Sequence, residues 1–135
     1  MSEIPRLEVT SVTLGAPDPR ALADFYVRLI GGSVVATDPP RPGQPPQDGW
    51  AQVKPPAGRL GLTLNFEYEP EYTAPTWPSE PGKQQIMEHL DIWVDDLAQA
   101  TAWAVGVGAR LADYQPQEDV RVLLDPAGHP FCLFS

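Results

Sequence analysis

The stretch from His89 to Asp96 reads His-Leu-Asp-Ile-Trp-Val-Asp-Asp and holds the side chains best suited to chemistry. Side chains alternate across a strand, so His89, Asp91 and Trp93 are predicted to share one face, with aliphatic residues on the other. An imidazole beside a carboxylate can bind a metal ion or transfer a proton. Because an alanine-rich helical run follows at once, that helix is expected to cover the apolar face and leave His89 on the open one.

Similar reasoning gives one polar face for the other expected strands. The residues assigned to it are Ser11, Thr13, Trp50, Gln52, Thr63, Asn65, Glu67, His89, Asp91, Trp93, Arg121 and Cys132. Such a face is typical either of the solvated side of an antiparallel sheet or of a concave ligand site. Two tryptophans on it favour the ligand site, where they offer apolar contact or a platform for a planar or cationic group.

Two helices and eight strands are expected to position these residues. The first helix begins after Asp18, a typical N-cap followed by proline, and ends at Gly31-Gly32. The second follows Asp96 and ends near Gly108. Strands are predicted at residues 7–15, 33–37, 50–54, 60–67, 89–94, 110–114, 120–125 and 131–135.

The chain repeats itself. Adding 78 to the residue numbers carries Ser11 to His89, Asp18 to Asp96 and Phe25 to Trp103, so the two helix stripes coincide. The repeat predicts an α+β domain of two βαβββ modules, residues 5–67 and 86–135, joined by a proline-rich connector at 68–85. Each module is expected to form a sheet with one helix packed on its outer side.

Composition narrows the class of partner. Among the 135 residues, 18 are acidic and 9 are basic, and the formal charge of −9 opposes binding to nucleic acid or to anionic lipid. The acidic balance suits solubility or a cationic ligand. A single cysteine and the lack of a long apolar run predict a cytoplasmic protein without a membrane anchor.

Three local motifs carry a resemblance to a known superfamily. They are Phe25-Tyr26 in the first expected helix, the stretch His89–Leu97, and Asp-Pro-Ala-Gly-His-Pro-Phe-Cys-Leu at 125–133. With the tandem repeat, they resemble a glyoxalase-like subgroup of the vicinal oxygen chelate superfamily. That superfamily contains glyoxalases, extradiol dioxygenases, fosfomycin-inactivating transferases and bleomycin-sequestering proteins. The resemblance implies that the sheets curve into a cup, and that the chain pairs into a homodimer.

The resemblance also implies a metal site with one ligand on each of the first, fourth, fifth and eighth strands. The matching positions are Ser11, Glu67, His89 and Cys132. Glu67 and His89 suit zinc, nickel, iron or manganese, whereas Ser11 is a poor ligand and Cys132 stands where a glutamate is usual. Glu67, His89 and Cys132 would form a three-ligand zinc site if the thiol ionised; otherwise Cys132 is a small buried apolar residue.

Two main functions stay open. One is a metal-free or metal-degenerate cup that binds a planar or cationic small molecule, by analogy with bleomycin-binding relatives. Its expected ligand-binding residues are Ser11, Thr13, Trp50, Gln52, Asn65, Asp91, Trp93 and Arg121. The other is a metal-dependent lyase, isomerase or dioxygenase in which Glu67 and His89 are catalytic. A metal-free acid–base enzyme using the same pair is a third possibility, whereas His129 is interpreted as a turn residue.

Overall fold

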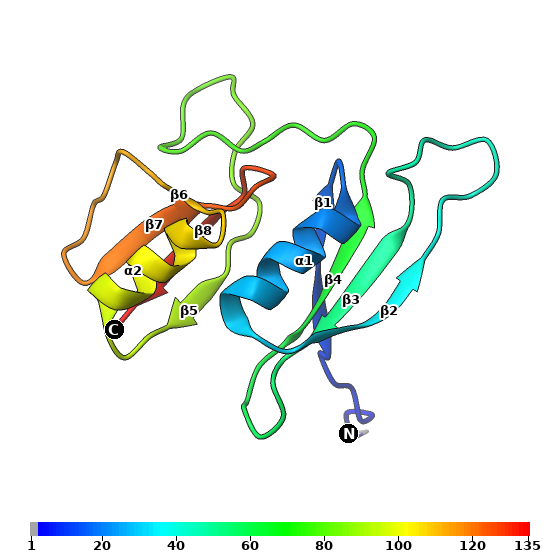
Figure 1. Cartoon of the computed structure of the whole chain (residues 1–135), viewed down its shortest axis with the longest axis horizontal. Coiled ribbons are helices and arrows are strands. Elements are labelled where there is room, and N and C mark those ends of the chain that lie inside the picture. The colour runs from blue at the N-terminus through cyan, green and yellow to red at the C-terminus, as the bar shows by residue number, and fades with distance from the viewer. Residues whose placement is uncertain (1–2) are drawn as a thin grey trace.

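The computed structural model describes residues 3–135 and contains the two expected modules (Figure 1). The first has helix α1 (Pro19–Ile30) and the second has helix α2 (Leu97–Gly106). The strands are β1 (Ser11–Ala16), β2 (Ser33–Asp38), β3 (Trp50–Lys54), β4 (Thr63–Tyr68), β5 (Asp91–Trp93), β6 (Arg110–Leu111), β7 (Val120–Leu124) and β8 (Pro130–Phe134). The α+β class and the two βαβββ modules are therefore confirmed.

Each module has its own four-stranded mixed sheet. The strand orders are β1-β4-β3-β2 and β5-β8-β7-β6, so β1 and β5 are edge strands of their sheets. In both sheets the first strand runs parallel to the last and the remaining pairs are antiparallel. The two sheets are thus built alike, as the internal repeat predicts.

Helix ends follow the local sequence. Asp18 accepts a hydrogen bond from the Ala21 amide at 3.1 Å, and Asp96 accepts one from the Gln99 amide at 3.0 Å. Such side chains satisfy amide groups that have no partner inside the helix. Gly31 ends α1 with φ 81°, a left-handed backbone that glycine adopts without a Cβ clash.

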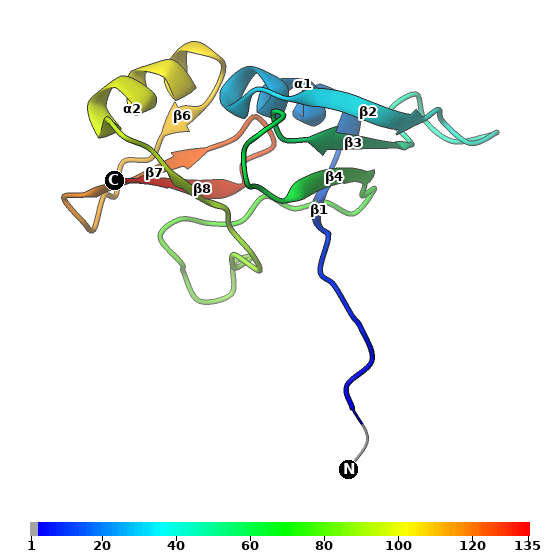
Figure 2. The same ribbon diagram turned by 90° about the horizontal axis from the view of Figure 1, so that it is seen from below.

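Both helices lie on one side of the two sheets, and the connector and the segment before β1 lie on the other (Figure 2). The segment at residues 3–10 is extended and exposed instead of continuing β1, so the first strand begins later than expected. No helix among residues 3–135 is long and apolar enough to cross a membrane.

An aromatic cluster beneath α1 joins the two modules. Tyr26 stacks on Phe66 of β4 with ring centroids 5.4 Å apart, and it meets Phe131 of β8 edge-on at 6.4 Å. Phe25 also contacts Phe131, at 6.3 Å, and these four side chains are fully buried. Burial of such large rings gives the modules a common core.

Helix α2 is less buried than its apolar stripe suggests. Only Ala104 is buried within it, and Trp103 is 57% exposed. The Trp103 indole donates a hydrogen bond to the Leu29 carbonyl oxygen at 3.1 Å, which ties α2 to the end of α1. This tryptophan therefore bridges the helices at the surface.

Candidate functional site

A ladder of polar side chains crosses the face of the first sheet that lies away from α1. Gln52 Nε2 donates to Asn65 Oδ1 at 3.0 Å, and Asn65 Nδ2 donates to Ser11 Oγ at 3.2 Å. Thr13 shares this face because it lies opposite Asn65 in the register of β1 and β4. Four of the expected ligand-binding residues are therefore on one surface.

Trp50 and Glu67 lie opposite each other on β3 and β4 at one end of that surface. Trp50 is half-buried and Glu67 is exposed. Opposite residues on antiparallel strands hold their side chains side by side on one face. Glu67 thus offers a carboxylate beside an indole, at the end of the polar ladder.

The proline-rich loop before β3 is held by ionic contacts. Arg41 binds Asp48 through its backbone amide and two guanidinium nitrogens, at 2.8 to 3.0 Å. These bonds lower the pKa of Asp48 from 3.8 to about 2, because they favour its charged form. Arg20 donates to the carbonyl oxygens of Asp38, Pro46 and Asp48. Trp50 therefore follows an anchored loop.

In the second module, His89, Asp91 and Cys132 come together. Asp91 lies opposite Cys132 in the parallel pair β5–β8, and His89 Nε2 is 3.1 Å from Asp91 Oδ1. One possible ligand atom from each residue lies within 4.8 Å of the other two. Nitrogen, carboxylate and sulfur donors in this arrangement suit a divalent metal such as zinc, with one position left for a further ligand.

Two features weaken that metal site. The side chains of His89 and Asp91 are 45% and 60% exposed. Burial, followed by the neighbouring Asp91 charge, raises the pKa of the Cys132 thiol, so the free thiolate is disfavoured. Glu67 is not part of the cluster. The structure thus groups His89 and Cys132 with Asp91, a residue expected to contact ligand, in place of Glu67.

The expected position of Arg121 is corrected by the strand register. Arg121 lies opposite Leu133, and buried Leu133 belongs to the core beneath the helices, whereas Cys132 lies opposite Val122. Arg121 is therefore on the helix side of its sheet. Its guanidinium donates to the carbonyl oxygens of residues 117, 118 and 120 and so braces the loop before β7.

A cleft of about 830 Å³ runs along the open edge of β1, and we call it the β1 cleft. Ser11, Thr13 and His89 line it, so it brings together expected site residues from both modules. The connector supplies much of the opposite wall. Other residues that line the cleft are Gly15, Tyr26, Glu69, Glu71, Tyr72, Glu88 and His129.

A second hollow of about 990 Å³ runs along the open edge of β5, between the modules. Asp91 and Trp93 line it together with leucines and with Trp103 of α2. Trp93 is 66% exposed and is available for contact. Trp50, Gln52, Asn65, Glu67, Arg121 and Cys132 line neither hollow among the residues described.

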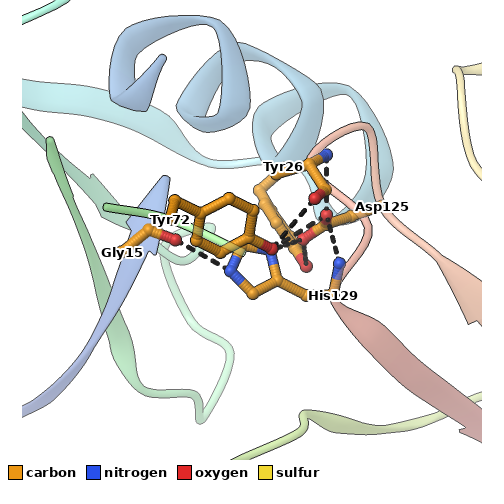
Figure 3. A network of polar contacts seen from close by, with 6 residues as sticks. Gly15, Tyr26, Tyr72, Asp125 and His129 are labelled. Atoms are coloured by element: carbon orange, nitrogen blue, oxygen red, sulfur yellow. Dashed lines mark hydrogen bonds and ion pairs between the residues drawn. The ribbon is translucent and has the colours of Figure 1, made fainter. Parts of the chain in front are cut away.

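Sequence reasoning missed a buried polar network at the junction of the modules (Figure 3). The Tyr26 hydroxyl donates to Asp125 Oδ2 at 2.8 Å, and His129 contacts both Asp125 and the Gly15 carbonyl oxygen. Burial and then Asp125 raise the pKa of Tyr26 well above its ordinary value, so its phenol stays protonated. The sequence does indicate the tyrosine of the first helix and the turn at residues 125–130. It carries no signal that the two are in contact.

The fold is that of a glyoxalase-like protein. A family model described as a glyoxalase-like domain matches residues 11–134, and the chain belongs to this family. A search of curated proteins finds no match. The family assignment confirms the resemblance that the sequence motifs carry.

Solved structures share the fold at low sequence identity. A glyoxalase family protein from Enterococcus faecalis is 22% identical with a TM-score of 0.66, over 95% of this chain and 97% of that one. TnmS3, an antibiotic binding protein from Streptomyces sp. CB03234, is 21% identical with a TM-score of 0.61, over 98% of each chain.

A mutant of the fosfomycin resistance protein FosX from Listeria monocytogenes is also similar in fold. That structure contains Mn(II) and 1S,2S-dihydroxypropylphosphonic acid. It is 12% identical with a TM-score of 0.66, over 95% of this chain and 91% of that one. The fold is therefore shared by an antibiotic binding protein and by a metal-containing protein.

Proposed function

We propose that this chain is a small-molecule-binding protein whose β1 cleft captures a planar, cationic ligand. The observation that carries the proposal is the charge of the cleft. Glu69, Glu71 and Glu88 line it, and among residues 3–135 no lysine or arginine does. Carboxylates at the wall of a partly enclosed cleft attract a cation more strongly than the same groups on a flat surface.

Aromatic and polar groups complete the recognition. Tyr72 and His129 line the cleft with ring centroids 5.2 Å apart, and a tyrosine face attracts a planar cation. Ser11 and Thr13 add hydroxyl groups on β1. Beyond them the ladder through Asn65 and Gln52 leads to Trp50, and we propose that a larger ligand extends over this surface.

The second hollow extends the same proposal. Asp91 and Trp93 offer a carboxylate and an exposed indole at the edge of β5. We propose that they contact the part of a ligand that passes between the modules. Arg121 contributes by bracing its loop, because its guanidinium is already bound to carbonyl groups on the helix side of the sheet.

We also propose a homodimer. The edges of β1 and β5 that face the space between the modules have no partner strand among residues 3–135, and unpaired edges invite association with another chain. A second copy over these edges would cover the exposed indoles of Trp93 and Trp103. Light scattering after size exclusion is expected to give twice the chain mass, and a monomer at micromolar concentration would contradict the proposal.

Titration with ethidium, a planar cation, tests the binding proposal. Saturable binding measured by calorimetry is expected, with little binding of an equally planar naphthalene sulfonate. The double change Glu71→Gln and Glu88→Gln is expected to weaken ethidium binding by about tenfold or more, since each lost charge–cation contact in a cleft contributes about 1 kcal/mol.

A matched control removes two charges elsewhere. Glu80 and Glu118 are exposed and do not line the β1 cleft. The double change Glu80→Gln and Glu118→Gln alters the net charge equally, and binding is expected to stay nearly unchanged. Equal losses in the two double variants would show a general charge effect and would contradict a specific cleft.

A metal-dependent lyase, isomerase or dioxygenase is the second candidate. The proximity of His89, Asp91 and Cys132 favours it. These three residues would hold the ion, which when bound would polarise substrate oxygen atoms, and Glu67 is proposed as the proton-transfer base. Because Glu67 lies outside the cluster, this role needs the substrate to reach across from β4.

Metal analysis separates the two candidates. The enzyme predicts about one zinc, nickel, iron or manganese ion per chain after purification, lost in His89→Ala together with turnover. The binding protein predicts substoichiometric metal and unchanged ethidium affinity after chelation. Stoichiometric, chelator-resistant metal would contradict a degenerate site.

A further inference from the structure

The turn from Asp125 to His129, between β7 and β8, is hydrogen-bonded to three parts of the chain outside its own module (Figure 3). Tyr26 of α1 donates to Asp125 Oδ2, and the Gly15 carbonyl oxygen of β1 lies 2.9 Å from His129 Nε2. Tyr72 of the connector donates to the Ala127 carbonyl oxygen at 2.9 Å. Each contact joins residues at least 55 positions apart in the chain.

Asp125 organises the turn from within. Its Oδ1 accepts the amides of Ala127 and His129 at 2.9 and 3.0 Å, and its Oδ2 lies 2.8 Å from His129 Nδ1. The carboxylate side chain has no solvent exposure. A buried carboxylate with so many donors is rigid, because losing any one of them leaves a polar group unsatisfied.

His129 contacts its own turn with one ring nitrogen and the first module with the other. Its Nδ1 stays within the turn, whereas its Nε2 reaches the other module. A carbonyl oxygen only accepts, so the contact with Gly15 requires a hydrogen on Nε2. The two ring nitrogens therefore make different contacts, and a substitution can remove one contact and keep the other.

The connector closes over the turn. A Cβ at Gly128, where φ is +91°, would lie 2.9 Å from Ala74 Cβ, so only glycine fits there without movement. The Tyr72 ring packs beside the His129 ring. The turn is thus enclosed by α1, β1 and the connector.

The same residues form a wall of the β1 cleft. Gly15, Tyr26, Tyr72 and His129 all line it. The sheets are separate, and among residues 3–135 the other hydrogen bonds between the modules lie on the helix side, where Trp103 donates to Leu29 and Arg28 donates to Val107. Releasing the turn would leave those links, the connector and the aromatic core as the remaining attachment.

We propose that the Asp125–His129 turn is a latch that fixes the second module against β1 and so holds the β1 cleft at its binding width. The link to binding rests on the proposed function, whereas the latch itself is a property of the free protein. In this device Tyr26, Tyr72 and His129 position the wall of the cleft, in addition to the direct ligand contact proposed for Tyr72 and His129.

Variants can remove the contacts between modules and spare the turn. His129→Asn keeps a donor near the Nδ1 position but withdraws the group that reaches Gly15, and Tyr26→Phe removes one hydroxyl. His129→Gln restores a donor near the Nε2 position. Tyr114→Phe removes a tyrosine hydroxyl that makes no hydrogen bond in the latch, and it is the control.

Residual dipolar couplings of the ligand-free protein test the latch. In the wild type and in Tyr114→Phe, one alignment tensor is expected to fit both modules. In the Tyr26→Phe/His129→Asn double variant, each module is expected to fit its own tensor while its chemical shifts stay native-like. A single tensor with unchanged relative orientation would overturn the proposal, and the mild single variant Tyr26→Phe gives the same readout at higher stability.

Ethidium titration of these variants tests the link to the cleft. Ethidium binding is expected to weaken by about tenfold in the double variant, because an affinity falls about tenfold when only about one-tenth of the molecules hold the binding-competent arrangement. Binding is expected to recover partly when His129→Gln replaces His129→Asn. A changed orientation with unchanged ethidium affinity would overturn this link. Failure of the wild type to bind ethidium would instead contradict the proposed function, and the orientation result would stand alone.

Discussion

The hydroxyl of Tyr26 lies 2.8 Å from Asp125 Oδ2, and this buried hydrogen bond joins residues 99 positions apart. Both side chains are shielded from solvent, so neither finds water when the other is removed. The bond couples the first helix to the last turn, and through it the stability of the domain depends on contact between the modules.

Tyr26→Phe is expected to lower the free energy of unfolding by about 1–3 kcal/mol, because Asp125 then loses a buried donor. Urea denaturation followed by tryptophan fluorescence measures this change. Tyr114→Phe, at a half-exposed ring, is expected to change the value by less than ~0.5 kcal/mol. Equal losses in both variants would contradict a special role for Tyr26.

Protonation of Asp48 is expected to lower the stability of the folded protein at acid pH. Its folded-state pKa is lowered from 3.8 to about 2, chiefly by the Arg41 side chain, so its contribution is complete above the unfolded pKa. That contribution is lost as the pH falls from about 4 towards 2. Thermal unfolding of Asp48→Asn is therefore expected to show a smaller loss of stability over this window than the wild type, and parallel curves would contradict the assignment.

Gly32 and Gly58 form a matched pair for a backbone test. Both have positive φ, +84° and +80°, but a Cβ at Gly32 would overlap the Lys54 carbonyl oxygen, whereas Gly58 has open space. Gly58→Ala is expected to cost about 1–2 kcal/mol from conformation alone. Gly32→Ala is expected to cost clearly more by chemical denaturation. Similar costs would mean that the backbone at Gly32 relaxes easily.

The His129 ring offers a spectroscopic prediction. Long-range ¹H–¹⁵N correlation spectra are expected to show a protonated Nε2 that exchanges slowly with water, because this nitrogen donates to the Gly15 carbonyl oxygen. In Tyr26→Phe the exchange is expected to accelerate. An unprotonated Nε2 would be incompatible with the latch.

Strand alternation predicted one face of the first sheet well. In β3 and β4 the polar residues alternate with buried apolar ones, and in β1 with partly buried ones, so the shared surface of Ser11, Gln52 and Asn65 follows from the sequence pattern. In β7 the residues Val120–Leu124 are mostly apolar on both faces, and the side of Arg121 was wrong because no alternation marked it.

The local sequence pattern does not predict which side chains from distant parts of the chain lie in contact. The 125–130 turn was recognised, and His129 does serve it, but its bond to Gly15 depends on how two sheets dock. In the same way, Asp91 in place of Glu67 beside His89 and Cys132 depends on the pairing of β5 with β8. Alternation along one strand carries no information about such contacts.

Chemical-shift mapping during an ethidium titration tests the central claim, that the β1 cleft is the ligand site, most directly. The account predicts the largest amide shifts at Ser11, Thr13, Tyr72 and His89, in the lining of this cleft. Shifts confined to Arg59, Gln99 and Trp103 around the other hollow, or no saturable shifts at all, would contradict it.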